Sequence, residues 1–193
     1  MADANHIDVD RALGFAIPGR SARGRVVRLG QVATDILSAH AYPPAIEALL
    51  AEALALGALI GSTLKDDAGQ LTLQAQTDNG VVRLLVVDYR AGELRGYVDY
   101  DADQLAAAPA EPTLFALFGQ GYLAITFDMA TTGERYQGIV PLDGATLTEA
   151  AENYFVRSEQ IPSLLRVGVQ RVGGRIVAGG LFLQYLREGE EGR

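Results

Sequence analysis

Two pairs of neighbouring charged residues are the first candidates for chemistry in this sequence. Glu134 stands next to Arg135, and Arg157 stands two residues before Glu159. If all four converged in one concave pocket with shifted pKa values, they would predict an enzyme acting on a small molecule. Surface or interface salt bridges are the commoner use of such pairs, so we favour paired charges over a reaction centre.

Histidine offers little support for acid–base catalysis. The sequence holds only His6, in a polar N-terminal stretch, and His40, at the end of a predicted helix beside prolines. A histidine at a helix C-terminus more often caps the helix or meets its dipole than acts as a general base. The sequence also lacks the Gly-x-Ser-x-Gly pattern of a nucleophilic serine. We therefore predict that the chain is not an enzyme.

Metal and redox chemistry would have to proceed without thiols, because the chain has no cysteine. A thiolate zinc site, an iron–sulfur cluster and a disulfide are all excluded for these residues. Asp99, Asp101 and Asp103 have the spacing that begins a calcium loop, but Gln104 occupies the sixth position, where that loop needs glycine. We expect a solvated acidic loop there, and no cofactor in this chain.

Nucleotide and nucleic-acid binding are also disfavoured. The Gly119-Gln120-Gly121 sequence follows a predicted helix and precedes a predicted strand, which is the reverse of a dinucleotide-binding turn. The formal net charge is −8 with a pI near 4.7, whereas a protein that binds the phosphate backbone needs clustered positive charge. We expect no nucleic-acid partner.

Membrane insertion and secretion are not predicted either. Asp3, Asp8 and Asp10 lie where a secretory signal would carry positive charge. The longest uncharged aliphatic run, between Glu52 and Lys65, is shorter than the roughly 20 residues of a spanning helix. The sequence therefore predicts a cytoplasmic protein with no membrane partner.

The helix predicted over residues 45–64 is the element around which the rest of the fold must pack. Pro43 and Pro44 can open a helix in its first turn, and good helix formers follow over residues 45–64. This helix is apolar on nearly all sides, so it must be buried on several of them. Gly57 and Gly61 match the small-xxx-small spacing of membrane dimers, but we favour close approach to a neighbouring strand.

The remaining pattern is mostly strands. Short strands are predicted at 15–17 and 25–29, followed by a short helix over 30–39. Three hairpins follow, with strands at 71–76 and 81–87, at 122–128 and 135–140, and at 164–172 and 175–186, while 94–100 is a further strand. Residues 101–112 form an excursion between elements.

Two further helices have recognisable beginnings. Thr113 can cap a helix that stops at Gly119, and Thr146 with Glu149 forms a capping-box pattern for a helix reaching about Gln160. The predicted fold is α+β, with a central buried helix between two largely antiparallel sheets and further helices outside. Residues 1–12 are expected to be a flexible lead-in, 13–186 one domain, and 187–193 the start of a linker.

Two residue strings resemble a known family. One runs from Gly133 to Gly138 and the other from Tyr154 to Pro162, and the likeness extends over roughly residues 13 to 186. Both resemble the N-terminal core of the bacterial redox-regulated 33 kDa heat-shock chaperones, also called 33 kDa chaperonins. The matching residues are Gly133, Glu134, Arg135, Tyr136, Gln137, Gly138, Tyr154, Phe155, Arg157, Ser158, Glu159, Gln160 and Pro162.

The resemblance implies an ATP-independent holdase, a stress-response chaperone that binds unfolding proteins, including thermally or oxidatively damaged ones, and prevents their aggregation. In that family a C-terminal domain binds zinc through four cysteines, and their oxidation activates and dimerises the chaperone. All four cysteines are missing here, so we carry over the chaperone core and not the zinc switch. The chain would then be a fragment of a longer protein or a naturally short homologue.

An alternative from a different functional class stays open. The chain could be an interaction module that forms a homodimer and binds no client of its own. Client-facing residues cannot be selected from alternation alone, because the same leucines, valines and phenylalanines are needed for the core. The client-binding surface is therefore unknown at this point.

Overall fold

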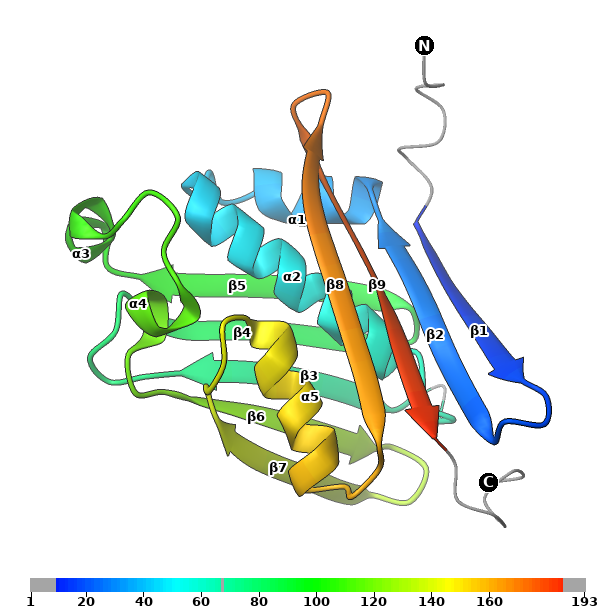
Figure 1. Cartoon of the computed structure of the whole chain (residues 1–193). Helices are drawn as coiled ribbons and strands as arrows, with labels where there is room; N and C mark the ends of the chain where they lie inside the picture. Colours follow the sequence, from blue (N-terminus) through cyan, green and yellow to red (C-terminus); the bar gives the residue numbers. More distant parts are fainter. Residues whose placement is uncertain (1–9, 67, 186–193) are drawn as a thin grey trace.

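The structure is a computed structural model that describes residues 10–66 and 68–185 (Figure 1). Two antiparallel sheets, in the orders β1-β2-β9-β8 and β5-β4-β3-β6-β7, pack on either side of helix α2. The elements are β1 (Arg11–Ile17), β2 (Ala22–Leu29), α1 (Gln31–Ser38), α2 (Pro44–Gly61), β3 (Gln70–Gln76), β4 (Val82–Arg90), β5 (Glu93–Tyr100), α3 (Ala102–Ala107), α4 (Leu114–Phe118), β6 (Tyr122–Met129), β7 (Glu134–Pro141), α5 (Leu147–Arg157), β8 (Ser163–Val172) and β9 (Arg175–Tyr185).

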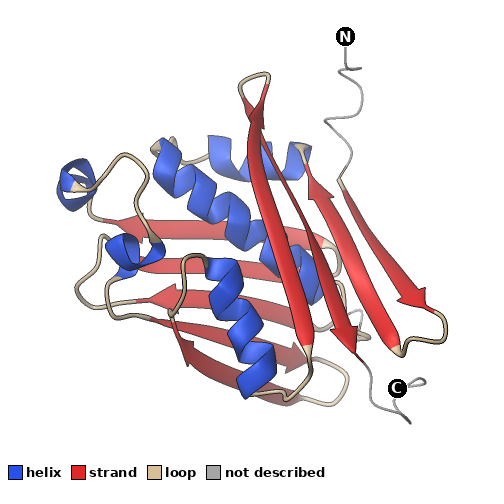
Figure 2. Cartoon of the chain, viewed as in Figure 1, coloured by secondary structure: helices blue, strands red, loops and turns tan. Residues whose placement is uncertain are grey.

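Helix α2 passes between the two sheets, as Figure 2 shows, and contacts strands of both. Its side chains from Ala53 to Ile60 are almost completely buried. By length and composition α2 could cross a membrane, but 72% of it lies inside the protein, as expected for a core helix. The predicted α+β fold with a central buried helix between antiparallel sheets is confirmed.

The glycines of α2 allow this close packing. A methyl group at Gly57 would come within 2.7 Å of Val87 Cγ1, and one at Gly61 would overlap the Tyr89 ring. Both neighbours belong to β4, so the prediction that these glycines serve close approach to a strand is confirmed.

Several boundaries differ from prediction. Strand β1 begins at Arg11, inside the stretch predicted to be a flexible lead-in, and the Asp10 carboxylate accepts hydrogen bonds from the backbone of Gly30 and Val32 at the start of α1. Helix α2 ends at Gly61 instead of 64, because a tight turn follows in which Leu64 N donates to Gly61 O. The predicted linker at 187–193 lies outside the described residues.

The excursion at 101–112 contains a helix that was not predicted. Asp101 caps α3 by accepting from the backbone of Asp103 and Gln104 at 3.1 and 3.0 Å.

Helix α5 ends at Arg157, three residues before the predicted end at Gln160. Gln160 itself adopts a left-handed conformation with φ of 54°. Both predicted cap residues act, since Thr113 accepts from Ala116 N and Thr146 accepts from Glu149 N. The Glu149 carboxylate accepts from Ala145 N, one residue before the position that the predicted capping box requires.

Candidate functional site

The two strings that resemble the family meet in space. Gly138 of β7 lies directly under the ring of Tyr154 of α5, so that even a methyl group at Gly138 would overlap that ring. The Tyr154 hydroxyl donates a hydrogen bond to the Glu159 carboxylate just beyond the helix. Burial and this carboxylate raise the pKa of the Tyr154 phenol.

Phe155, the residue after Tyr154, packs α5 against the four-stranded sheet. The Phe155 ring packs on Tyr154 at a centroid distance of 5.1 Å and on Phe182 of β9 at 4.8 Å. Helix α5 therefore connects β7 of the five-stranded sheet with β9 of the four-stranded sheet. Residues of the two strings therefore pack between the two sheets.

The four charged residues considered for catalysis do not converge, and three of them contact different partners. Glu134 accepts from Tyr136 Oη at 2.9 Å, Arg135 lies 3.4 Å from an Asp128 carboxylate oxygen, and Glu159 serves Tyr154. Arg157 is exposed at the end of α5. None of the four lines the groove that is bordered by α2, α5 and β8. They act as surface pairs and a helix-end contact.

The other residues considered for chemistry have structural contacts instead. The His40 ring stacks on Tyr42 at 5.0 Å, so this side chain joins an aromatic cluster, and the predicted cap is made only by its backbone N–H to Leu37 O. Asp99 pairs with Arg83 at 3.2 Å. Gly119 ends α4 in a left-handed conformation, which supports the helix stop and turn expected there. His6 lies outside the described residues.

No group of three or more His, Cys, Asp or Glu side chains is placed to hold a metal within residues 10–66 and 68–185. The chain also has no cysteine. The donor set that the family resemblance implies for zinc is thus not present, and zinc chemistry does not fit the residues of this chain.

A surface that the sequence did not single out lies on the four-stranded sheet. Phe182 and Leu165 are buried against the helices, so residues that alternate with them point outward. The register aligns Leu13 of β1 with Val26 of β2 and Val26 with Leu181 of β9. We call this surface the outer apolar face, and its members are Leu13, Phe15, Ile17, Val26, Leu164, Leu181, Leu183 and Tyr185.

The outer apolar face is open to solvent. Leu13 is 58% exposed, and Ile17, Val26 and Tyr185 are also exposed. No described element covers them, because α2 and α5 pack on the opposite side of this sheet. A contiguous exposed apolar surface of this kind is typical of an interaction site.

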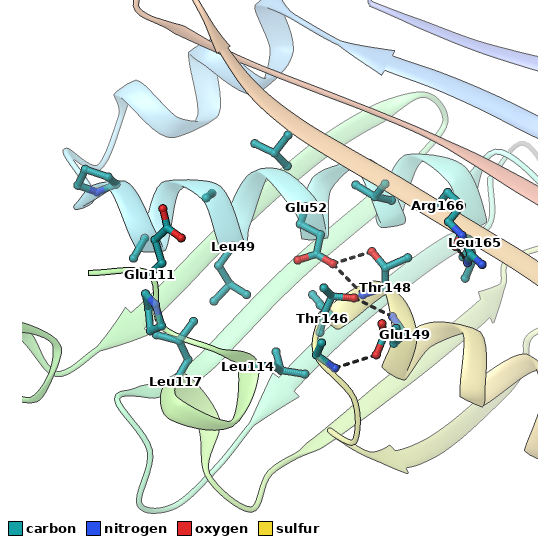
Figure 3. Close-up of a pocket in the computed structure, with 18 of the residues that line it drawn as sticks. Leu49, Glu52, Glu111, Leu114, Leu117, Thr146, Thr148, Glu149, Leu165 and Arg166 are labelled. Atoms are coloured by element: carbon teal, nitrogen blue, oxygen red, sulfur yellow. Dashed lines mark hydrogen bonds between the residues drawn. The ribbon is translucent and has the colours of Figure 1, made fainter. Parts of the chain in front are cut away.

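A groove of about 1050 Å³ borders the same sheet at its β8 edge (Figure 3). Its walls come from the first half of α2, the α3–α4 connection with α4, the start of α5, and β8. Leu49, Leu114, Leu117 and Val167 give it an apolar lining. The groove therefore combines an apolar floor with an open strand edge.

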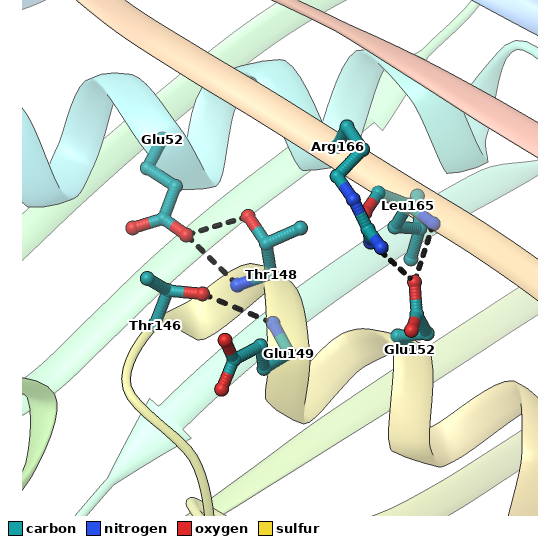
Figure 4. Close-up of polar contacts among 7 residues, drawn as sticks. All are labelled: Glu52, Thr146, Thr148, Glu149, Glu152, Leu165 and Arg166. Atoms are coloured by element: carbon teal, nitrogen blue, oxygen red, sulfur yellow. Dashed lines mark hydrogen bonds and ion pairs between the residues drawn. The ribbon is translucent and has the colours of Figure 1, made fainter.

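Two carboxylates at the rim of this groove accept hydrogen bonds from main-chain groups of α5 and β8 (Figure 4). Glu52 of α2 accepts from Thr148 N at 2.8 Å and from its hydroxyl at 2.6 Å, which satisfies the first turn of α5. Burial raises the pKa of the Glu52 carboxyl, although the Thr148 bonds oppose the shift. Glu152 accepts from Leu165 N at 2.7 Å and pairs with Arg166 at 3.0 Å.

The chain is similar to known chaperonins over most of its length. The family model described as Hsp33 protein matches residues 10–192. A 33 kDa chaperonin of Caulobacter vibrioides (strain NA1000 / CB15N) is 42% identical over 185 residues, which cover 92% of this chain and 61% of that protein. A 33 kDa chaperonin of Yersinia pestis (strain Pestoides F) is 38% identical, covering 95% and 60% respectively.

Structure comparison agrees with the sequence comparison. The crystal structure of the 33 kDa chaperonin (heat shock protein 33 homolog) of Thermotoga maritima matches with a TM-score of 0.76 and 25% identity. The match covers 93% of this chain and 62% of that one. The chain thus spans about 60% of the length of the relatives it matches.

Proposed function

Because the chain belongs to the Hsp33 family, whose members are chaperones and not enzymes, we propose that it is the client-binding core of an ATP-independent holdase. In this proposal it captures unfolding proteins, including thermally or oxidatively damaged ones, and holds them so that they do not aggregate. We place the protein in the cytoplasm, with unfolded clients as its partners.

The outer apolar face is the observation that carries this proposal. An unfolding protein exposes apolar side chains without a fixed sequence, and burial of such surface contributes roughly 25 cal/mol per Å² whatever the sequence. An exposed sheet surface bearing Leu13, Val26 and Leu181 can contact many such segments. The contact needs no nucleotide and no reaction centre.

Regulation is a separate part of the proposal. The relatives are longer than the matched region, and the family resemblance assigns zinc and redox control to a cysteine-bearing C-terminal domain. We propose that residues 10–185 form the chaperone core and that their client binding does not depend on thiols. Dimerisation belongs to the same regulated behaviour and is proposed only for the longer proteins.

A light-scattering assay with a thermally unfolding client tests the function directly. The purified chain, without nucleotide, is expected to suppress aggregation at several-fold molar excess. Peroxide and thiol reductants should leave that suppression unchanged, because the chain has no thiol to oxidise. Undiminished aggregation at all ratios would refute holdase activity, and sedimentation would then test the homodimer module instead.

A further inference from the structure

The edge of strand β8 has unpaired main-chain groups that face the groove. Tyr185 N donates to Pro162 O at 3.0 Å, so these two opposing residues form a hydrogen-bonded pair. In an antiparallel ladder such pairs alternate with pairs that are not hydrogen-bonded. Along β8, the main-chain groups of Leu165, Val167 and Val169 therefore point away from β9. The contacts of Leu165 support this orientation. Its N–H donates to the Glu152 carboxylate and its carbonyl accepts from the Arg166 guanidinium at 2.5 Å, so neither group is bonded to β9.

Charged residues close this edge at both ends and leave its middle open. Glu152 and Arg166 occupy the edge at Leu165, and Arg171 pairs with Glu47 of α2 near the other end. Between them, the outward N–H and C=O groups of Val167 and Val169 have no hydrogen-bond partner within the described chain. Both residues line the groove. An open edge of this kind is a template for another strand.

We propose that this groove takes an extended segment of an unfolded client, which adds to β8 as a further antiparallel strand. The inference rests on the proposed function and names the form in which that client binds. The stretch between Leu165 and Arg171 accommodates about five residues at roughly 3.3 Å each. Main-chain hydrogen bonds to Val167 and Val169 supply binding that is independent of client sequence.

Side chains of the added strand would alternate between two environments. Those on the inner side face the apolar lining, which includes Leu49, Leu114 and Leu117. The rim is acidic, because Glu52, Glu111 and Glu149 face it while its cation, Arg166, is already paired with Glu152. The groove as a whole is therefore negatively charged, and it is suited to a segment that is apolar on its inner side and carries a net positive charge. A second copy of this chain, with net charge −8, is a poorer electrostatic match.

The probe that tests this inference is a fluorescein-labelled decapeptide of alternating valine and arginine, measured by fluorescence anisotropy. One analogue is N-methylated at its valines and a second at its arginines, so that the two have the same composition. In an antiparallel added strand the valine amides face β8, and their methylation should weaken binding about tenfold or more. Methylation at the arginines should change binding by less than about twofold.

Variants of the protein give the complementary test. Val167→Pro removes the outward N–H and places ring atoms on the strand edge, a position where proline is tolerated. It should weaken binding of the unmodified peptide about tenfold, while Val167→Thr, which keeps the N–H, stays within about twofold. Circular dichroism and thermal unfolding check the fold of both. If Val167→Pro does not fold, the two peptide analogues on the wild-type chain still decide.

The outcomes separate the inference from the proposed function. If the chain suppresses aggregation but binds both analogues equally, or does not bind the peptide, strand addition at β8 is wrong and the holdase function stands. Binding of folded Val167→Pro at wild-type strength would also overturn it. If the peptide binds with the expected asymmetry but aggregation is not suppressed, the holdase proposal fails while the strand site is supported.

Discussion

The outward faces of the two sheets are built in opposite ways. On the five-stranded sheet, the central strand β3 presents Gln70, Thr72, Gln74 and Gln76. These side chains bond to one another and to neighbouring strands, as when Gln70 donates to Asp88 at 3.1 Å. On the four-stranded sheet, the outer apolar face runs across neighbouring strands from Leu13 through Val26 to Leu181.

The two sheets differ in how their exposed apolar residues are arranged. The five-stranded sheet also exposes apolar residues, but the polar stripe on β3 separates Val86 and Tyr97 on one side from Ile139 on the other. Scattered exposed apolar residues are ordinary in folded proteins, whereas a contiguous surface is not. Contiguity, and not the number of exposed apolar residues, distinguishes the outer apolar face.

The largest expected effect contrasts the interior with the outer apolar face. Leu54→Ala, in the buried centre of α2, should lower the free energy of unfolding by about 2–5 kcal/mol, because it leaves a cavity. Leu13→Ala should change it by less than about 0.5 kcal/mol, since that leucine is exposed. Chemical denaturation measures both. A destabilisation at Leu13 comparable to that at Leu54 would mean that the outer apolar face is part of the core.

A pair of glycines extends the contrast to packing. Gly138→Ala should destabilise the protein by about 1–3 kcal/mol, because the added methyl group collides with the buried Tyr154 ring. Gly168, on the outward side of β8, has no atom near the position of a Cβ. Gly168→Ala should therefore leave stability unchanged or slightly raised, as thermal unfolding would show. Equal losses at both positions would contradict the open outer face.

The smallest expected effect concerns the groove rim and depends on pH. Burial raises the pKa of Glu52 in the folded protein above the unfolded value of about 4.5. A carboxyl group of this kind reduces stability as pH rises through the interval between its two pKa values. Glu52→Gln, which can still accept from Thr148, should thus be more stable than the wild type at pH 7 and lose that advantage near pH 4.

Denaturation curves at several pH values test this prediction, with Glu111→Gln as the control. Glu111 lines the same groove but is exposed. Its substitution should leave the pH dependence of stability as it is in the wild type. A stability difference for Glu52→Gln that grows as pH falls would have the wrong sign and would refute the assigned role of burial.

Local sequence patterns were sufficient for most elements. The apolar run after Pro44 predicted the buried helix, and Thr113 and Thr146 marked two further helix starts. Helix α3 was not predicted because the alanines and prolines of residues 101–112 suggested a connecting segment, although Asp101 is a good N-cap residue. The start of β1 was missed because residues near Arg11 lack an alternating pattern, and this strand forms only by pairing with β2.

The candidate surfaces could not be predicted in the same way. Alternation shows that Val26 and Val27 point to opposite sides of β2, but only the pairing of β2 with β9 shows which side meets the helices. That pairing joins residues near 22–29 with residues near 178–185, from opposite ends of the chain. The groove likewise collects α2, α4, α5 and β8, which no local pattern brings together.

The most direct test compares the two outward faces in the light-scattering assay. Leu13→Ser with Val26→Ser interrupts the outer apolar face, while Ile139→Ser with Tyr97→Ser removes exposed apolar residues from the other sheet; Leu13 and Ile139 are both 58% exposed. The first double variant should need at least about fivefold more protein to suppress client aggregation, and the second should act as the wild type does. Equal suppression by both double variants would contradict the claim that clients bind the four-stranded sheet.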